Sequence, residues 1–388
     1  MLKNRHAFSL AFLMGGLPIL FVFRDFLPFD KQTFTYAIVF GVLVALPKYK
    51  NIINLKVFTN GFNVSIYFLF SMSIIIFLIS FIENRFSHQT ISIGIIIYLI
   101  FSLVTLEKKD YIYFIDYMFF ISSFSVIISF IFTPTSIEYW LIRGGRFYVG
   151  DTNNPDLISW VSCIVIISAV FYFYKYKRIS MFVKLYMLSS IIVAVYLWIL
   201  SFSKSSILSI VMIILFLALK KRKIFFNWKT TLVLIIIVIS FFVYLPDKID
   251  TIINAINSLI GNNTTNMSAS IRYENFKKAF ELFSITNFFG YGINTFRMDS
   301  PILQMSLDLG IIISFFMLYL FFLYPMFNIF YYKIKNLSEN ELFSILLYLF
   351  FLPNLFFHGT PYEWDTWLPV VLFYAINKSQ LIFKVGKQ

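Results

Sequence analysis

Residues 182–201 read Phe-Val-Lys-Leu-Tyr-Met-Leu-Ser-Ser-Ile-Ile-Val-Ala-Val-Tyr-Leu-Trp-Ile-Leu-Ser, and Lys184 is the only charged side chain among them. A helix rises about 1.5 Å per residue, so a run of this length crosses the hydrocarbon core of a bilayer, which is about 30 Å thick. Apolar runs of the same kind recur along the chain. The stretch therefore predicts a membrane-spanning helix, and its repetition predicts an all-α, polytopic membrane protein.

The overall composition indicates the same class. Of the 388 residues, 59% are hydrophobic and 13% are charged, whereas soluble domains are about half apolar and about a quarter charged. The apolar content suffices for roughly eleven or twelve spans of about 20 residues. Soluble enzymes, secreted disulfide scaffolds and disordered tails are thereby excluded. The single cysteine, Cys163, can form no intramolecular disulfide, and the three histidines are too scattered for a structural zinc site.

We expect about 12 transmembrane helices in a single integral membrane domain, residues 1–388. With both termini in the cytoplasm, 21 of the 32 basic residues fall in inner segments, while 14 of the 19 acidic residues fall outside. Cytoplasmic loops retain Lys and Arg, so this orientation is preferred, and the net charge of +13 needs no nucleic-acid partner. The expected spans are 7–23, 33–47, 62–82, 90–106, 111–132, 157–174, 182–201, 205–219, 230–246, 309–330, 340–357 and 366–382.

Two outer, periplasmic loops are long, 133–156 and 247–308, and long connections usually carry function. In the second loop, residues 247–260 have the apolar spacing of an amphipathic helix that lies on the outer leaflet. We expect another amphipathic helix to begin with Ser270 as its N-cap. A purely structural lid is the alternative for both helices. The apolar face of the later helix would be formed by Tyr273, Phe276, Phe280 and Phe283.

Four arginines lie in these outer loops, where membrane proteins keep few cations. A guanidinium group is a planar, permanently charged fork that suits phosphate oxygens. An enzyme acting on a lipid-linked pyrophosphate needs such groups to hold the diphosphate and to offset the charge that grows as the glycosyl bond breaks. Ordinary solvated or headgroup-facing arginines are the alternative. The four are Arg143, Arg146, Arg272 and Arg297.

The first outer loop also contains a glycine-punctuated turn between Arg143 and Asp156. Its Asp151 and Asn154 can form hydrogen bonds with sugar hydroxyls. The chain has no Walker loop, no His-Glu-x-x-His and no Asp-x-Asp cluster. We therefore expect neither a metal nor a cofactor.

A series of short motifs runs between residues 140 and 320. It begins with Arg-Phe…Asn-Pro before a span and continues with Ser-Phe-Ser-Lys-Ser-Ser at 201–206. Then follow Ser-Ala-Ser-Ile-Arg-Tyr-Glu-Asn-Phe-Lys-Lys-Ala-Phe at 268–280, Asn-Phe-Phe-Gly-Tyr-Gly at 287–292 and Leu-Asp-Leu-Gly-Ile at 307–311. In this order the motifs resemble the O-antigen ligase and polymerase superfamily of bacterial envelope glycosyltransferases.

The resemblance implies an all-helical membrane bundle with a large periplasmic loop. It also implies a metal-independent, GT-C-like membrane glycosyltransferase that takes a glycan from undecaprenyl pyrophosphate without a nucleotide sugar. By position, Arg146 and Arg272 would contact the pyrophosphate. Lys204 stands where ligases usually have arginine, which keeps the charge but loses the bidentate fork.

Ligases of this superfamily also carry a catalytic histidine shortly after the Gly-x-Gly segment. This chain has Asp299 there and no histidine, which favours the polymerase (Wzy-type) branch, whose acceptor is another lipid-linked repeat unit. A general base assists transfer to a hydroxyl, and Asp299 ranks first for that role, followed by Glu274, Asp151, Glu138 and His358. His358 lies among aromatic residues and is equally interpreted as an interfacial histidine.

The preferred function is thus polymerisation of lipid-linked oligosaccharide repeat units for O-antigen or capsule. The alternatives are an O-antigen ligase or oligosaccharyltransferase and, from another class, a flippase or transporter of the same lipid-linked oligosaccharide. A flippase is expected to have short loops on both sides and charges in mid-membrane, so the enzyme is favoured. The expected location is the bacterial inner membrane, with the active site on the periplasmic side. Partners would be undecaprenyl-pyrophosphate-linked oligosaccharide, the lipid bilayer and, as a candidate, a chain-length regulator protein.

Overall fold

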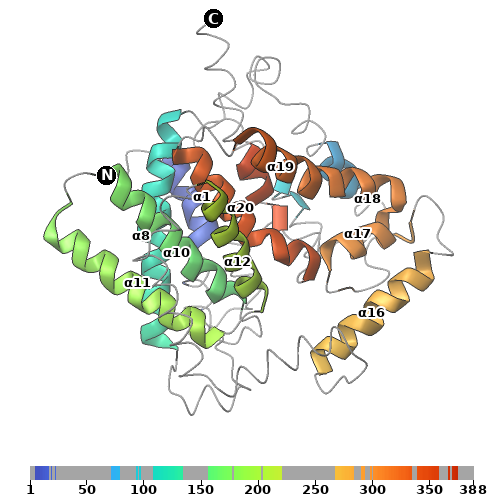
Figure 1. Ribbon diagram of the computed structural model, residues 1–388, viewed down its shortest axis with the longest axis horizontal. Helices are drawn as coiled ribbons and strands as arrows, with labels where there is room; N and C mark the ends of the chain where they lie inside the picture. The colour runs from blue at the N-terminus through green and yellow to red at the C-terminus, as the bar shows by residue number, and fades with distance from the viewer. Residues whose placement is uncertain are drawn as a thin grey trace, which may run out of the picture. The chain divides into compact units, whose positions relative to one another are not determined.

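The computed structural model is all-helical over the residues that it describes, and none of these residues forms a strand (Figure 1). The chain divides into two compact units, each described here by itself. One unit comprises Met1–Ile210, Asn336–Pro353 and Tyr362–Gln388, and the other comprises Val211–Lys335 and Asn354–Pro361. The described residues are 5–16, 19, 22, 71–78, 93–94, 96–97, 108–133, 156–176, 179–201, 204–220, 267–283, 290–292, 298, 300–333, 339–357, 366–367 and 369–374.

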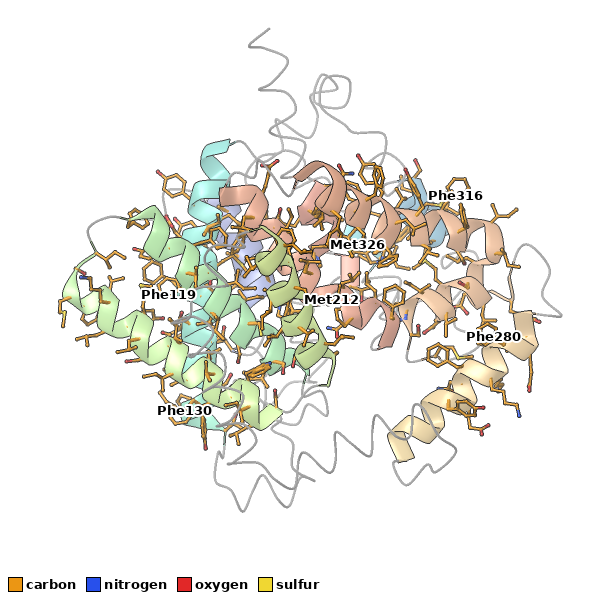
Figure 2. All side chains as sticks on the ribbon, in the orientation of Figure 1. Phe119, Phe130, Met212, Phe280, Phe316 and Met326 are labelled. Carbon is orange, nitrogen blue, oxygen red and sulfur yellow. The ribbon has the colours of Figure 1, made fainter. Side chains whose placement is uncertain are left out.

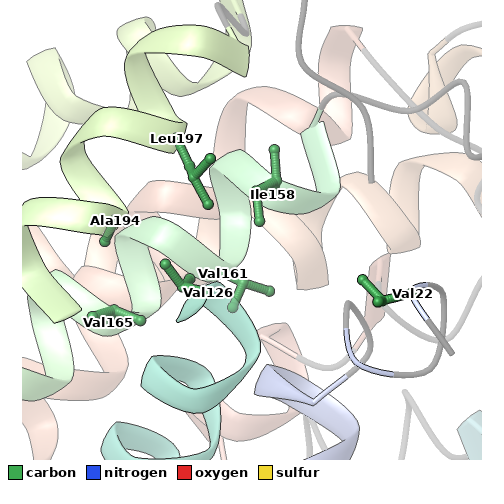
Figure 3. Packing of buried hydrophobic residues seen from close by; sticks show 7 residues of the cluster. All are labelled: Val22, Val126, Ile158, Val161, Val165, Ala194 and Leu197. Carbon is green, nitrogen blue, oxygen red and sulfur yellow. The ribbon is translucent and has the colours of Figure 1, made fainter. Parts of the chain in front are cut away.

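The first unit is centred on three long helices, α8, α10 and α11, which pack side by side (Figure 1). Each is an apolar run without an internal proline, so the backbone satisfies its own hydrogen bonds, as it must in a bilayer. Val126, Val161 and Leu197, one from each helix, meet in a buried cluster (Figure 3). The helices of this unit are α1 (Arg5–Gly15), α8 (Lys108–Phe132), α10 (Asp156–Lys175), α11 (Met181–Ser201), the start of α12 (Lys204–Lys220) and most of α20 (Glu339–Phe357).

The outer surface of α11 has the character of a lipid-facing helix. Its large side chains Phe182, Leu188 and Ile192 are 80%, 57% and 59% exposed, whereas the small residues Ser190 and Ala194 are fully buried. A soluble helix buries its large apolar side chains, but helices in a membrane pack through small residues and turn large ones towards lipid. Phe130 on α8 is likewise exposed (Figure 2). These surfaces indicate a membrane protein.

The two ends of this helix group are fixed by different contacts. At one end, the hydroxyl of Tyr176, just after α10, donates to Oδ2 of Asp116 on α8 at 2.7 Å. Burial and this carboxylate raise the pKa of Tyr176, so the phenol keeps its proton and remains the donor. At the other end, Ser159 at the start of α10 contacts Ser201 at the end of α11. The helices α10 and α11 are therefore antiparallel neighbours, as two consecutive spans require.

The second unit contains α16 and a long, interrupted helical segment. Gly310, at φ +84°, separates the first two helices of that segment. Pro325 lacks an N–H and its ring crowds the carbonyl of Phe321, and next to it the N–H of Tyr324 bonds the carbonyl of Tyr319, as in a π-helix. The elements are α16 (Met267–Phe283), α17 (Pro301–Leu309), α18 (Ile311–Leu318), π-helical η1 (Tyr319–Leu323), α19 (Tyr324–Phe327) and π-helical η2 (Asn328–Lys333).

Several sequence-based spans are confirmed as helices. The spans 111–132, 157–174, 182–201, 205–219 and 340–357 correspond to α8, α10, α11, α12 and α20 within a few residues. Three helices are long and apolar enough to cross a membrane, Tyr113–Phe132, Met181–Ser201 and Ile311–Phe330, and shorter apolar helices accompany them. The total of twelve spans remains a prediction.

Other expectations are corrected by the structure or concern residues outside the described ones. The helix expected to start at Ser270 begins at Met267, so Ser270 lies in its first turns and is not the N-cap. Residues 301–308, which the sequence assigned to the second outer loop, belong to α17. The spans 33–47 and 230–246 and the amphipathic helix at 247–260 lie outside the described residues.

Candidate functional site

Two of the short motifs, far apart in sequence, meet in the second unit. The N–H of Tyr291 donates to the carbonyl of Leu307 at 2.8 Å, and the N–H of Gly292 donates to the carbonyl of Asp308 at 3.0 Å. The Gly-Tyr-Gly segment thus lies along the C-terminal end of α17. Helix-terminal carbonyls have no partner within their own helix, and these two bonds satisfy two of them.

Gly290 makes this contact sterically feasible. Its φ is +76°, in the left-handed region that L side chains rarely adopt. A Cβ at this position would lie 2.4 Å from the backbone nitrogen of Gly310 and 2.5 Å from the carbonyl oxygen of Asp308. Both glycine motifs therefore allow the two backbones to approach each other closely at this point.

The helix α16 packs against the same segments, Gly-Tyr-Gly and α17. Ala279 of α16 is fully buried against Met298 and Leu307, and Leu282 and Tyr291 complete the cluster. The hydroxyl of Tyr291 donates to the carbonyl of Leu282 at 3.3 Å. The glycine segment, the C-terminal end of α17 and the C-terminal half of α16 thus form one packed group.

The register of α16 separates its two candidate site residues. Residue 272 precedes Ala279 by seven positions, which leaves the two within about 20° on a helix of 3.6 residues per turn. Residue 272 therefore lies about 10 Å from Ala279 along the axis of α16, on the side of the helix that packs on Met298. Glu274 is five positions before Ala279, on the opposite side, and is exposed. The side chain of Arg272 itself lies outside the described residues.

Two of the four aromatic residues expected on the apolar face of α16 are exposed. Tyr273 and Phe280 are 62% and 67% exposed, and Phe280 is labelled in Figure 2. The expected helix is therefore present, and its residues Ala279 and Leu282 pack in the buried cluster.

The start of α17 follows directly after the position of the ligase histidine. Ser300 is the N-cap residue with extended backbone, and Pro301 occupies the first helical turn, where a missing N–H costs nothing. Met298 and Ser300 are 4% and 5% exposed. The two residues on either side of Asp299 are thus buried, whereas Asp299 and Arg297 lie outside the described residues.

Asp308 is a buried acid that the sequence analysis used only as part of a motif. It is 1% exposed, and Nε2 of Gln304, one helical turn earlier, lies 3.5 Å from its Oδ2. The i, i+4 spacing of an amide and a carboxylate was the available signal. Among the described residues, no three His, Cys, Asp or Glu side chains are close enough to hold a metal ion.

In the first unit, Lys204 is the first residue of α12. Its side chain lies outside the described residues, but Ser201 and Ser206 on either side of it are buried. The remaining candidates also lie outside the described residues, namely Arg143, Arg146, Asp151, Asn154 and His358. Their roles remain predictions.

Residues 189–323 match a family model described as O-Antigen ligase. The matched region begins in α11 and includes Lys204, α16, the Gly-Tyr-Gly segment and α17. The match places residues 189–323 in the O-antigen ligase/polymerase superfamily and does not distinguish its branches. No curated protein and no solved structure gives a significant match. Membership supports a ligase- or polymerase-type function and indicates a bacterial membrane enzyme that acts on lipid-linked sugars.

Proposed function

We propose that the protein polymerises undecaprenyl-pyrophosphate-linked oligosaccharide repeat units for O-antigen or capsular polysaccharide. The observation that carries this proposal is in the sequence, which has Asp299 where the resemblance to ligases implies a histidine. A superfamily member without that histidine fits the branch whose acceptor is a second lipid-linked repeat unit. The match to the superfamily supports the lipid-linked donor but does not distinguish the two branches.

The reaction requires little besides positioning and charge. A hydroxyl of the acceptor sugar attacks the anomeric carbon of the donor glycan, and the bond from that carbon to the pyrophosphate oxygen breaks. The electron pair leaves with the pyrophosphate, whose growing charge needs cationic donors. We assign this role to Arg272, which by helical register shares the side of Ala279, and we assign the proton of the attacking hydroxyl to Asp299 as general base. The pyrophosphate leaving group supplies the driving force, so the reaction needs no metal, nucleotide sugar or cofactor.

The alternatives differ in the acceptor or in the process. An O-antigen ligase or oligosaccharyltransferase would pass the same glycan to lipid A core or to a protein. A flippase would carry the lipid-linked oligosaccharide across the bilayer. The motifs of 268–311, gathered on α16 and α17, favour an enzyme over a flippase.

The proposed orientation places both termini in the cytoplasm of the inner membrane and the active site in the periplasm. In that orientation, a cysteine at the exposed position Lys278 on α16 should react from outside with a membrane-impermeant thiol reagent. One at the exposed position Ser180, between α10 and α11, should react only after the membrane is opened. The native Cys163 is buried and gives the background. Labelling at Ser180 and not at Lys278 would reverse the proposed sidedness.

The product distinguishes the three functions. Purified protein in liposomes, supplied with one kind of undecaprenyl-pyrophosphate repeat unit, should yield a ladder of longer lipid-linked chains on a gel. EDTA and the absence of ATP should leave the ladder unchanged, because the donor already carries its leaving group.

Each alternative predicts a different result in the same assay. A ligase would give no product until lipid A core or a protein acceptor is added, and would then yield one transferred glycan. A flippase would move the donor to the other leaflet without lengthening it. Either result would refute the polymerase.

A further inference from the structure

Three helix ends of the first unit are joined by a buried group of polar side chains. Oγ of Ser159 on α10 lies 2.5 Å from Oγ of Ser201 at the end of α11 and 3.4 Å from Oγ of Ser206 in the first turn of α12. Nε1 of Trp198 donates to Oγ of Ser206 at 3.0 Å. We call Ser159, Trp198, Ser201 and Ser206 the serine–tryptophan cluster.

The cluster is deeply buried in an apolar environment. Ser159, Ser201 and Ser206 are 1%, 0% and 2% exposed, and Trp160 next to Ser159 packs edge-on against Phe351 of α20 with ring centroids 4.5 Å apart. A buried hydroxyl that loses its partner is destabilising, because its lost hydration is no longer replaced by a hydrogen bond. The cluster therefore links the three helix ends through buried hydrogen bonds.

Two members of the cluster flank Lys204 in the sequence. Ser201 lies three residues before Lys204 and Ser206 lies two residues after it, so the single hydroxyl of Ser159 contacts both sides of a six-residue segment with the lysine inside. Below this segment, Ser209 of α12 donates to the carbonyl of Phe350 on α20. The backbone that carries Lys204 is thus anchored before it, after it and one turn further along.

We propose that Ser159 is a positioning residue that holds the backbone of Lys204 in the orientation needed to bind the pyrophosphate of the lipid-linked donor. The proposal rests on the proposed function and adds to it a second cationic contact to that pyrophosphate, Lys204, which stands where ligases usually have arginine. Lysine is a compact charge on a flexible stem and lacks the preorganised fork of arginine. An anchored backbone compensates in part for this flexibility. It fixes the point from which the stem extends, so binding has to order only the side chain.

The chain offers a matched control on the same helix. Ser162 is fully buried on α10, three residues after Ser159, and its Oγ has no hydrogen-bond partner among the described residues. Ser159→Ala and Ser162→Ala therefore remove the same atom from the same depth of the same helix, but only the first opens the cluster.

The test measures binding of undecaprenyl pyrophosphate to purified full-length protein in nanodiscs. One neutral hydrogen bond corresponds to a roughly 3- to 10-fold change, so Ser159→Ala should raise Kd by about that factor, whereas Ser162→Ala should not. In a Lys204→Ala background, Ser159→Ala should have no further effect, because the two residues act through one contact. Trp198→Phe, which removes the other donor to Ser206, should behave like Ser159→Ala and serves if that variant does not fold.

Each outcome has a defined meaning. Equal Kd values for Ser159→Ala and Ser162→Ala would overturn the proposal, and so would an effect of Ser159→Ala that persists without Lys204, since a merely structural role weakens both backgrounds. A Lys204→Ala variant that binds normally would overturn it as well. If the unaltered protein forms no ladder and binds no undecaprenyl pyrophosphate, the proposed function fails. If it does both while Ser159→Ala is normal, only this inference fails.

Discussion

Replacing Arg272 by alanine is expected to lower the rate of chain lengthening by about 10²–10³-fold, the usual loss when one charge-assisted donor to a developing anion is removed. Residue 272 lies on the side of α16 that carries Ala279 into the packed cluster with Met298. Arg272→Lys should recover little of the rate, because a point charge does not reproduce the bidentate fork. The measurement is the initial rate of ladder formation at equal amounts of purified protein.

Lys277 provides the control for charge alone. It lies on the same helix but about 160° away from Ala279, and it is exposed. Lys277→Ala removes one positive charge, as Arg272→Ala does, and should leave the rate within about twofold, since surface charges away from a site contribute little. If both variants lose activity equally, Arg272 acts only through the general charge of α16.

Gly290→Ala is expected to destabilise the protein by about 2–5 kcal/mol, which combines the cost of a left-handed backbone with that of overpacking against a second backbone. The added Cβ would meet the backbone nitrogen of Gly310 at 2.4 Å, and a backbone atom cannot turn aside as a flexible side chain can. The predicted readout is a lower midpoint of thermal unfolding, followed by intrinsic fluorescence of the protein in detergent.

Two variants separate the causes of this loss. Gly94 is helical, and a Cβ there would find only Cε2 of Phe77 at 3.8 Å, an ordinary contact, so Gly94→Ala should be neutral or gain up to about 1 kcal/mol. Gly290→Asn keeps the clash, but asparagine tolerates positive φ better than alanine does. This variant should therefore recover only the smaller part of the lost stability. A Gly290→Ala protein as stable as Gly94→Ala would contradict the packing of the Gly-Tyr-Gly segment on α17.

The class of the protein and the positions of its apolar helices follow from local sequence. The run 182–201 predicts α11 to within one residue because the length and hydropathy of a span depend on the bilayer and not on any distant part of the chain. The same reasoning identifies α10 and α12. The motif order 201–206, 268–280, 287–292 and 307–311 also sufficed to indicate the superfamily that the family match supports.

Hydropathy alone does not indicate which residues of α16 pack against the rest of the protein. Tyr273 and Phe280 were expected on its apolar face, yet both are exposed, and the fully buried residue in the cluster is the small Ala279. In a membrane protein, both lipid and protein accept apolar side chains. Periodicity therefore shows that a helix has two faces but does not show which face contacts the rest of the chain.

The contacts that build the candidate site depended on the tertiary structure alone. The bonds from Tyr291 and Gly292 to the end of α17 join residues about sixteen positions apart in sequence, and Ser159 reaches Ser201 and Ser206 across more than forty. Serine occurs in many apolar helices, where its hydroxyl usually bonds the preceding turn, as Ser168 does with the carbonyl of Ile164. Sequence thus predicted most of the apolar helices and the residues proposed to carry the chemistry. Only the packing of helix against helix decided which hydroxyls and glycines meet, because that depends on backbone approach between distant segments.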